Sequence, residues 1–181
     1  GANFTLGISG AGLPGSYNGT CNFSIQSFPH PAVVTRVDPV VNFDWAYGTP
    51  NDVTVVNASG ATTNPVDNYS TVFEGYLHPT AAGNYQFQLD ADDKARVLLD
   101  TDADGPGGLV EILEHGWDGA TTPETIGTFK ISAAIPLVVP ANETKRYKIR
   151  VEHVETTGDA RCRLQWRAGA AHYENIHRYL R

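Results

Sequence analysis

Several short segments of the sequence show a period of two in their apolar residues. Apolar or aromatic side chains recur at even spacings in three segments: Phe73 and Leu77 in 71–77, Tyr85, Phe87 and Leu89 in 85–89, and Tyr147, Ile149 and Val151 in 147–151. Successive side chains of a β-strand point to opposite faces, so this pattern predicts strands with one buried face. Apolar runs at 97–99 and 135–139 predict buried strands, and 18 glycines and 11 prolines predict the turns between strands. The chain is therefore predicted to be all-β, an antiparallel β-sandwich or barrel.

Size and composition set the class of protein. With 181 residues, 41% of them hydrophobic and 18% charged, the chain is expected to fold as one domain over residues 1–181. A net charge of −7 disfavours nucleic acid as a partner, and no apolar stretch is long enough for membrane insertion. The absence of methionine and the start at Gly1 suggest a module excised from a larger protein, and we expect it to be monomeric in isolation.

The asparagines point to a place outside the cytoplasm, and this in turn favours a disulfide between the two cysteines. Cys21 and Cys162 lie near opposite ends of the chain, and Cys162 shares strand parity with Leu164, so it should face the core. We predict a disulfide between the two cysteines; the alternative is two unrelated buried thiols. Six of the eleven asparagines head Asn-x-Ser/Thr triplets: Asn3, Asn18, Asn22, Asn57, Asn68 and Asn142. They mark either glycosylation sites of a secreted chain or a Thr- and Asn-rich bacterial surface, and both favour a secreted or cell-surface protein.

A pair of adjacent acids provides the main candidate site. Asp92 and Asp93 close a strand-like run, and the run that begins at Tyr147 opens into the polar loop Glu155 to Asp159. Paired carboxylates at a strand end, facing an oxygen-rich loop, are suitable ligands for calcium. The alternative is a solvated strand end or turn.

A second acidic segment fits the calcium-loop formula D-x-D-x-D-G-x5-E at every fixed position. Its acids are Asp100, Asp102, Asp104 and Glu111. The flanking residues look like strands, whereas an EF-hand needs helices, and the run from Pro106 to Gly108 forbids an exit helix. The segment is either a second cation site or a long acidic hairpin loop.

The sequence gives no support for an enzyme. It contains neither a Gly-x-Ser-x-Gly elbow nor a His-Glu-x-x-His motif, and nothing selects one pair among the many carboxylates for glycoside hydrolysis. We therefore expect a non-enzymatic protein.

The order of several segments resembles the protective-antigen-type lectin-like domain family, usually called PA-fourteen. The matching segments are Gly12-Leu-Pro-Gly-Ser-Tyr17, Thr35-Arg-Val-Asp38, Val41-Asn-Phe-Asp-Trp45, Phe73-Glu-Gly-Tyr-Leu77, Gly83-Asn-Tyr-Gln-Phe87, Asp92-Asp93, Tyr147-Lys-Ile-Arg-Val151 and Leu164-Gln-Trp166. The likeness extends over nearly the whole chain, and many loose matches in the right order make it specific.

The resemblance implies a β-sandwich and a set of calcium ligands. In sugar-binding members, among them fungal flocculins and bacterial surface adhesins, two adjacent aspartates joined by a cis peptide hold the ion, and these correspond to Asp92 and Asp93. The remaining protein ligands would be the side chain of Glu155 and the backbone carbonyls of Thr157 and Asp159. Glu155 departs from the asparagine of the fungal members, which makes the site more anionic.

The function implied is calcium-dependent carbohydrate binding, in which the ion bound by Asp92 and Asp93 coordinates sugar hydroxyls directly. His115 and Trp117 are candidates for a wall of the sugar site, with a structural role for Trp117 as the alternative. The partner is then a glycan or polysaccharide. The rival function is a structural or interaction module without sugar affinity, attached to a hydrolase or toxin.

Overall fold

The computed structural model describes residues 4–9, 34–38, 40–47, 55–56, 62–63, 69–102, 108–117, 127–139 and 146–176. None of these residues lies in a helix, so no helix able to cross a membrane occurs among them. The strands are, in chain order, β1 (Phe4–Ser9), β2 (Val34–Asp38), β3 (Asn42–Ala46), β4 (Val55–Val56), β5 (Thr62–Thr63), β6 (Tyr69–Leu77), β7 (Gly83–Asp92), β8 (Lys94–Leu99), β9 (Val110–His115), β10 (Lys130–Ile131), β11 (Ile135–Leu137), β12 (Tyr147–Glu155), β13 (Ala160–Ala168) and β14 (Glu174–Asn175).

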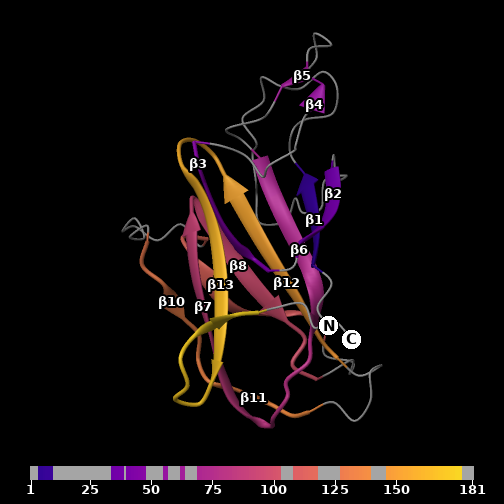
Figure 1. The fold of residues 1–181 in the computed structure, drawn as a ribbon, viewed down its shortest axis with the longest axis vertical. Coiled ribbons are helices and arrows are strands. Elements are labelled where there is room, and N and C mark those ends of the chain that lie inside the picture. Colours follow the sequence, from indigo (N-terminus) through magenta and orange to yellow (C-terminus); the bar gives the residue numbers. More distant parts are fainter. Residues whose placement is uncertain are drawn as a thin grey trace.

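The strands form two antiparallel sheets and a separate short hairpin (Figure 1). The first sheet has the order β2-β1-β6-β12-β8-β9. The second has the order β10-β7-β13-β14, with β11 also paired to β7 and β3 to β13. The hairpin pairs β4 with β5. The prediction of an all-β antiparallel sandwich is therefore confirmed.

The apolar period of two builds the core. In β6, for example, Phe73 and Leu77 are 0% and 1% exposed, whereas Tyr76 between them is 38% exposed. The inner faces of both sheets contribute to a single apolar cluster, which includes Phe73, Leu77, Phe87, Leu89, Val97, Leu99, Ile149, Val151 and Leu164. Burial of each such side chain contributes about 1.5–3 kcal/mol, so this face-to-face packing is the main source of stability.

Two connections pass from one sheet to the other at the same end of the sandwich, and they determine where the candidate site lies. β7 continues into β8 through Asp93 alone, and β12 continues into β13 through residues 156–159. Because β7 pairs with β13 and β8 pairs with β12, the two connections run side by side. In the ladders Asp92 lies opposite Arg161 and Lys94 lies opposite Val154. The fold thereby brings together two corners that are about sixty residues apart in sequence.

Candidate functional site

The first corner is the peptide that joins Asp92 to Asp93. This peptide is cis, as the family resemblance implied. Asp92 is the last residue of β7, and Asp93 occupies the single position between β7 and β8. The two carboxylates therefore lie at the very end of the sandwich, where the chain changes sheets.

The Asp93 carboxylate is oriented by the second corner. Its Oδ2 accepts hydrogen bonds from the Thr156 amide at 2.5 Å and the Thr157 amide at 3.3 Å, and also from the Thr156 hydroxyl. All three donors reach the same oxygen. Oδ1 receives no hydrogen bond within the described part of the chain, so it is available to a ligand.

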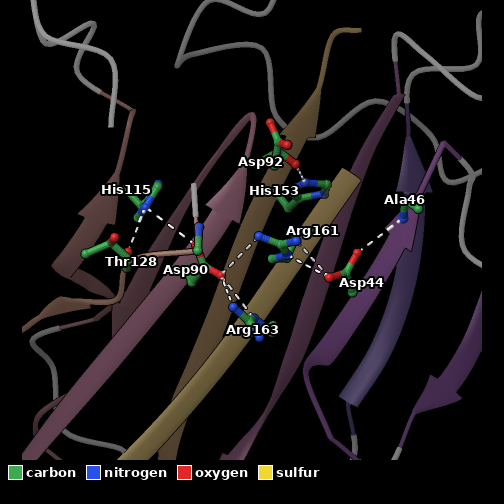
Figure 2. A network of polar contacts seen from close by, with 10 residues as sticks. Asp44, Ala46, Asp90, Asp92, His115, Thr128, His153, Arg161 and Arg163 are labelled. Atoms are coloured by element: carbon green, nitrogen blue, oxygen red, sulfur yellow. Dashed lines mark hydrogen bonds and ion pairs between the residues drawn. The ribbon is translucent and has the colours of Figure 1, made fainter. Parts of the chain in front are cut away.

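The Asp92 carboxylate is buried without a donor. The residue is 7% exposed, and no amide or side chain among the described residues donates a hydrogen bond to its carboxylate (Figure 2). Burial, and after it the negative charge of Asp93, raises the pKa of the Asp92 carboxyl from 3.8 to about 6. Arg161 opposes this rise, whereas Asp159 and Asp90 add to it. Burial and the neighbouring acids therefore both disfavour the ionised form of Asp92, and Arg161 offsets them only in part.

The second corner supplies further oxygen atoms. Gly158 has a φ of +103°, a conformation that side chains rarely adopt, and it turns the chain between β12 and β13. Thr157 and Asp159 are exposed, and the charge of Asp159 acts on Asp92. Glu155 is fully buried and lies opposite Tyr69 in the β12–β6 ladder. The fold therefore brings all five predicted calcium ligands to this one end of the sandwich.

The donor chemistry of these two corners fits calcium. Carboxylate and carbonyl oxygens are the ligands that calcium accepts in proteins, and a cation would offset the charge that raises the pKa of Asp92. Within the described residues no group of three or more His, Cys, Asp or Glu side chains is already gathered as a metal site. An ion here would need backbone carbonyls of the second corner beside the carboxylates of Asp92, Asp93 and Glu155.

A histidine that the sequence reasoning missed lies directly beneath the pair. His153 is fully buried, and its Nε2 lies 2.7 Å from the Asp92 carbonyl oxygen (Figure 2). Burial lowers the pKa of His153 from 6.5 to about 4, although its bond to Asp92 and the charge of Asp93 act in the opposite direction. The ring is therefore neutral at physiological pH. The sequence does hold a signal for this residue. His153 follows Val151 by two positions, so its side chain is predicted to point to the same inner face, next to the corner.

A buried ionic cluster around Asp90 was also missed. Asp90 is fully buried, and its Oδ2 accepts hydrogen bonds from Arg163 Nε at 3.0 Å and Nη2 at 2.5 Å (Figure 2). Its Oδ1 accepts from the Gly127 amide at 2.9 Å and lies 3.9 Å from His115 Nε2. Asp90 therefore ties residue 127 to the second sheet two positions before Asp92.

Neither member of the predicted sugar wall offers an open ring face. His115 is 1% exposed and donates from Nε2 to the Thr128 carbonyl oxygen at 3.2 Å. Trp117 is 4% exposed, and the Arg96 guanidinium lies 4.6 Å from the centroid of its ring. As placed, both residues have the structural role that was the alternative for Trp117.

The second acidic segment is only partly described, because Asp104 lies outside the described residues. Asp100 Oδ1 accepts a hydrogen bond from the Asp102 amide at 3.0 Å, which closes a local turn. Glu111 instead forms an ion pair with Arg96, with Oε2 and Nη1 3.4 Å apart. The side chains of Asp100 and Glu111 are thus engaged with different partners.

Cys162 is buried in the core, as its strand parity predicted, and it forms no disulfide with another described residue. Burial raises its pKa well above the usual range for a thiol. Cys21 lies outside the described residues, as do the six asparagines of the Asn-x-Ser/Thr triplets. The disulfide between Cys21 and Cys162 stays a prediction.

Comparison with known proteins agrees with this geometry. Residues 12–103 match the PA14 domain. The chain is 26% identical over 168 residues to the anti-sigma-I factor RsgI3 of Acetivibrio thermocellus, an alignment that covers 93% of this chain. It spans only 21% of that protein's length.

Two solved structures share the fold. The PA14 sugar-binding domain from an RTX adhesin has a TM-score of 0.62 at 18% identity, over 96% of this chain and 94% of that one. The A domain of epithelial adhesin 9 from Candida glabrata, in complex with Galβ1-4GlcNAc, has a TM-score of 0.63 at 13% identity, over 99% and 89%. Because the PA14 match covers more than half of the sequence, the chain belongs to the PA14 domain family.

Proposed function

We propose that the chain is a non-enzymatic carbohydrate-binding module in which calcium bound at Asp92 and Asp93 holds the sugar. The observation that carries this proposal is the pair of neighbouring carboxylates at a corner between the two sheets. One receives no hydrogen bond from any described residue, and the other is oriented by the adjacent loop. Two neighbouring carboxylates that are partly removed from water repel each other when both are ionised, and a bound cation would relieve this repulsion.

In this proposal each residue of the two corners has a distinct task. Asp92 and Asp93 provide the carboxylate ligands, and the hydrogen bonds from Thr156 and Thr157 hold Asp93 in one orientation. Glu155 would add its side chain, while Thr157 and Asp159 would add backbone carbonyls. Calcium accepts six to eight oxygen ligands, so an ion bound here would have positions left for neighbouring hydroxyls of a sugar.

The relatives support a glycan partner and a location at the cell surface. The RTX adhesin domain is described as sugar-binding, and the Candida glabrata adhesin was solved with a disaccharide. A secreted or surface-exposed protein that contains this chain would meet polysaccharides or glycoconjugates directly. Wall residues other than His115 and Trp117 would then set the sugar preference, since both of these side chains are buried.

The alternative is an interaction module without sugar affinity inside a larger protein. The alignment of 93% of this chain with a segment of an anti-sigma-I factor favours this alternative, because it links the sequence to a regulatory protein. Such a module could still bind calcium for stability, so metal binding alone does not separate the two functions.

Binding to a glycan array in calcium, and again after chelation, tests the proposal. We expect glycan binding that disappears with chelator and returns when calcium is restored. Binding that survives chelation would exclude the calcium-dependent mechanism, and silence under both conditions, with calcium binding intact in calorimetry, would favour the interaction module.

A further inference from the structure

The end of β12 carries a buried histidine that links the two sheets at the candidate site. His153 lies opposite Thr71 in the β12–β6 ladder of the first sheet, and its side chain reaches across to Asp92 in the second. Its Nε2 is 2.7 Å from the Asp92 carbonyl oxygen, and its Nδ1 is 3.1 Å from Thr71 Oγ1. Both His153 and Thr71 are fully buried, so water does not compete for these contacts.

The chemistry of the partners fixes the tautomer of the imidazole. A carbonyl oxygen can only accept, so the proton of the neutral ring must be on Nε2, which donates to Asp92. Nδ1 is then an acceptor, and the Thr71 hydroxyl donates to it. The two contacts support each other, because the Thr71 hydroxyl favours the tautomer that binds Asp92.

The carbonyl that His153 holds belongs to the peptide unit between Asp92 and Asp93. A peptide unit is a rigid plane. Because Asp92 is already held in the β7–β13 ladder, fixing the carbonyl oxygen of this unit also fixes the Cα atoms at both of its ends. The directions in which both carboxylates leave the backbone depend on those two atoms. A contact to this single oxygen therefore bears on both acids at once.

The ring is also held against sliding. The Trp45 ring lies 5.7 Å from it, centroid to centroid, and the Tyr69 ring lies 6.1 Å from it in an edge-on arrangement. The aromatic rings pack against the imidazole, and both of its nitrogens have hydrogen-bond partners. Packing alone would be served equally well by an apolar ring of this size, which could not bind the Asp92 carbonyl.

We propose that His153 is a positioning residue of the Asp92–Asp93 site. Its Nδ1 accepts a hydrogen bond from Thr71, and its Nε2 donates to the Asp92 carbonyl and thereby orients both carboxylates for the cation. This inference rests on the proposed calcium function. Residues that orient metal ligands typically contribute 10- to 100-fold to metal affinity, and His153 belongs to this class without touching the ion.

Two polar substitutions that differ in reach provide the test. The amide nitrogen of His153→Gln can occupy the place of Nε2 and still donate to Asp92. The shorter His153→Asn reaches only the place of Nδ1 and retains the contact to Thr71 alone. Calorimetric titration with calcium should show His153→Gln within about threefold of the parent chain and His153→Asn about 10- to 30-fold weaker. Near-ultraviolet circular dichroism checks that both variants are folded.

A measurement on the unmodified chain keeps the inference testable if the variants do not fold. Long-range ¹H–¹⁵N correlation NMR distinguishes the two imidazole tautomers, and we expect the Nε2-protonated form of His153 in calcium-free protein near neutral pH. The Nδ1-protonated form, or equal calcium affinity of the Gln and Asn variants, would overturn the positioning role. If the parent chain itself binds no calcium, the proposed function fails first and the positioning role fails with it.

Discussion

Arg161 lies directly across the β7–β13 ladder from Asp92, yet its guanidinium pairs with two other acids. Its Nη2 is 2.8 Å from Asp44 Oδ2, and its Nη1 is 3.8 Å from Asp90 Oδ2. Arg161 therefore lowers the pKa of Asp92 only partly, and the pKa stays raised to about 6. A cation that is engaged elsewhere leaves the Asp92 carboxylate able to bind a metal ion, which an ion pair with Arg161 would prevent.

The raised pKa predicts that Asp92→Asn stabilises the calcium-free protein near neutral pH. A folded-state pKa above the ordinary 3.8 means that folding disfavours the ionised carboxylate, so stability falls as pH rises from about 4 to above 6. The neutral amide avoids this loss. We expect the variant to be more stable by about 1–2 kcal/mol at about pH 7.5, and by almost nothing at about pH 4.

Urea denaturation in chelator at both pH values measures this difference, with Asp102→Asn in the exposed turn as a matched control. At neutral pH, excess calcium should make the parent chain more stable than Asp92→Asn, because only the parent chain binds the ion tightly. A variant less stable than the parent in chelator at neutral pH would contradict the account of Asp92.

Asp93→Ala should abolish measurable calcium and sugar binding while the domain stays folded. The change removes one carboxylate ligand and also the acceptor that orders Thr156 and Thr157. Because the change removes a charged ligand and also the contact that orders the ligand-bearing loop, the affinity for calcium should fall by at least about 100-fold. Calorimetry reports the affinity, and a normal isotherm for this variant would reject the assignment.

Removal of Glu155 is expected to weaken calcium binding less than removal of Asp93. Glu155→Gln keeps the size and one oxygen of the buried side chain and restores an amide ligand like the asparagine implied by the resemblance. We expect a loss of about three- to tenfold in affinity, since the carbonyls of the same loop remain. Equal or larger loss than in Asp93→Ala, measured by the same titration, would reverse this ranking.

The chain should bind one calcium ion. Glu111 pairs with Arg96, and Asp100 accepts a hydrogen bond from the Asp102 amide, so these two carboxylates already have different partners. The stoichiometry from calorimetry or equilibrium dialysis measures this directly, with Asp102→Ala predicted to leave both number and affinity unchanged. Two ions per chain, reduced to one by that substitution, would make the acidic segment a site.

Asp90→Asn should be among the most destabilising single changes. It removes the fully buried charge that pairs with the partly exposed Arg163 and faces the partly exposed Arg161. Loss of one partner of a buried pair leaves the other uncompensated, and we expect about 2–3 kcal/mol lower unfolding free energy. Glu111→Gln, which breaks a more exposed pair with Arg96, should change it by less than about 1 kcal/mol in the same denaturation assay.

Much of this fold could be predicted from local pattern. The alternation in residues 71–77 and 147–151 required strands with one buried face, and β6 and β12 include those segments. The pair Asp92 and Asp93 was identifiable because two acids end a strand-like run. Local pattern does not disclose burial beyond the strand faces, so it left His115 and Trp117 as candidates for a sugar wall, with a structural role as the alternative for Trp117; both are buried.

The strands, their inward faces and the two acids at residues 92 and 93 follow from chain periodicity and neighbouring residue types. Which groups contact those acids depends instead on how the two sheets pair and pack. Thr156 reaches Asp93, and His153 reaches the Asp92 carbonyl, across more than sixty residues of chain. The physical reason is the pairing of β7 with β13 and β8 with β12, which places two changes of sheet side by side and which no local pattern encodes.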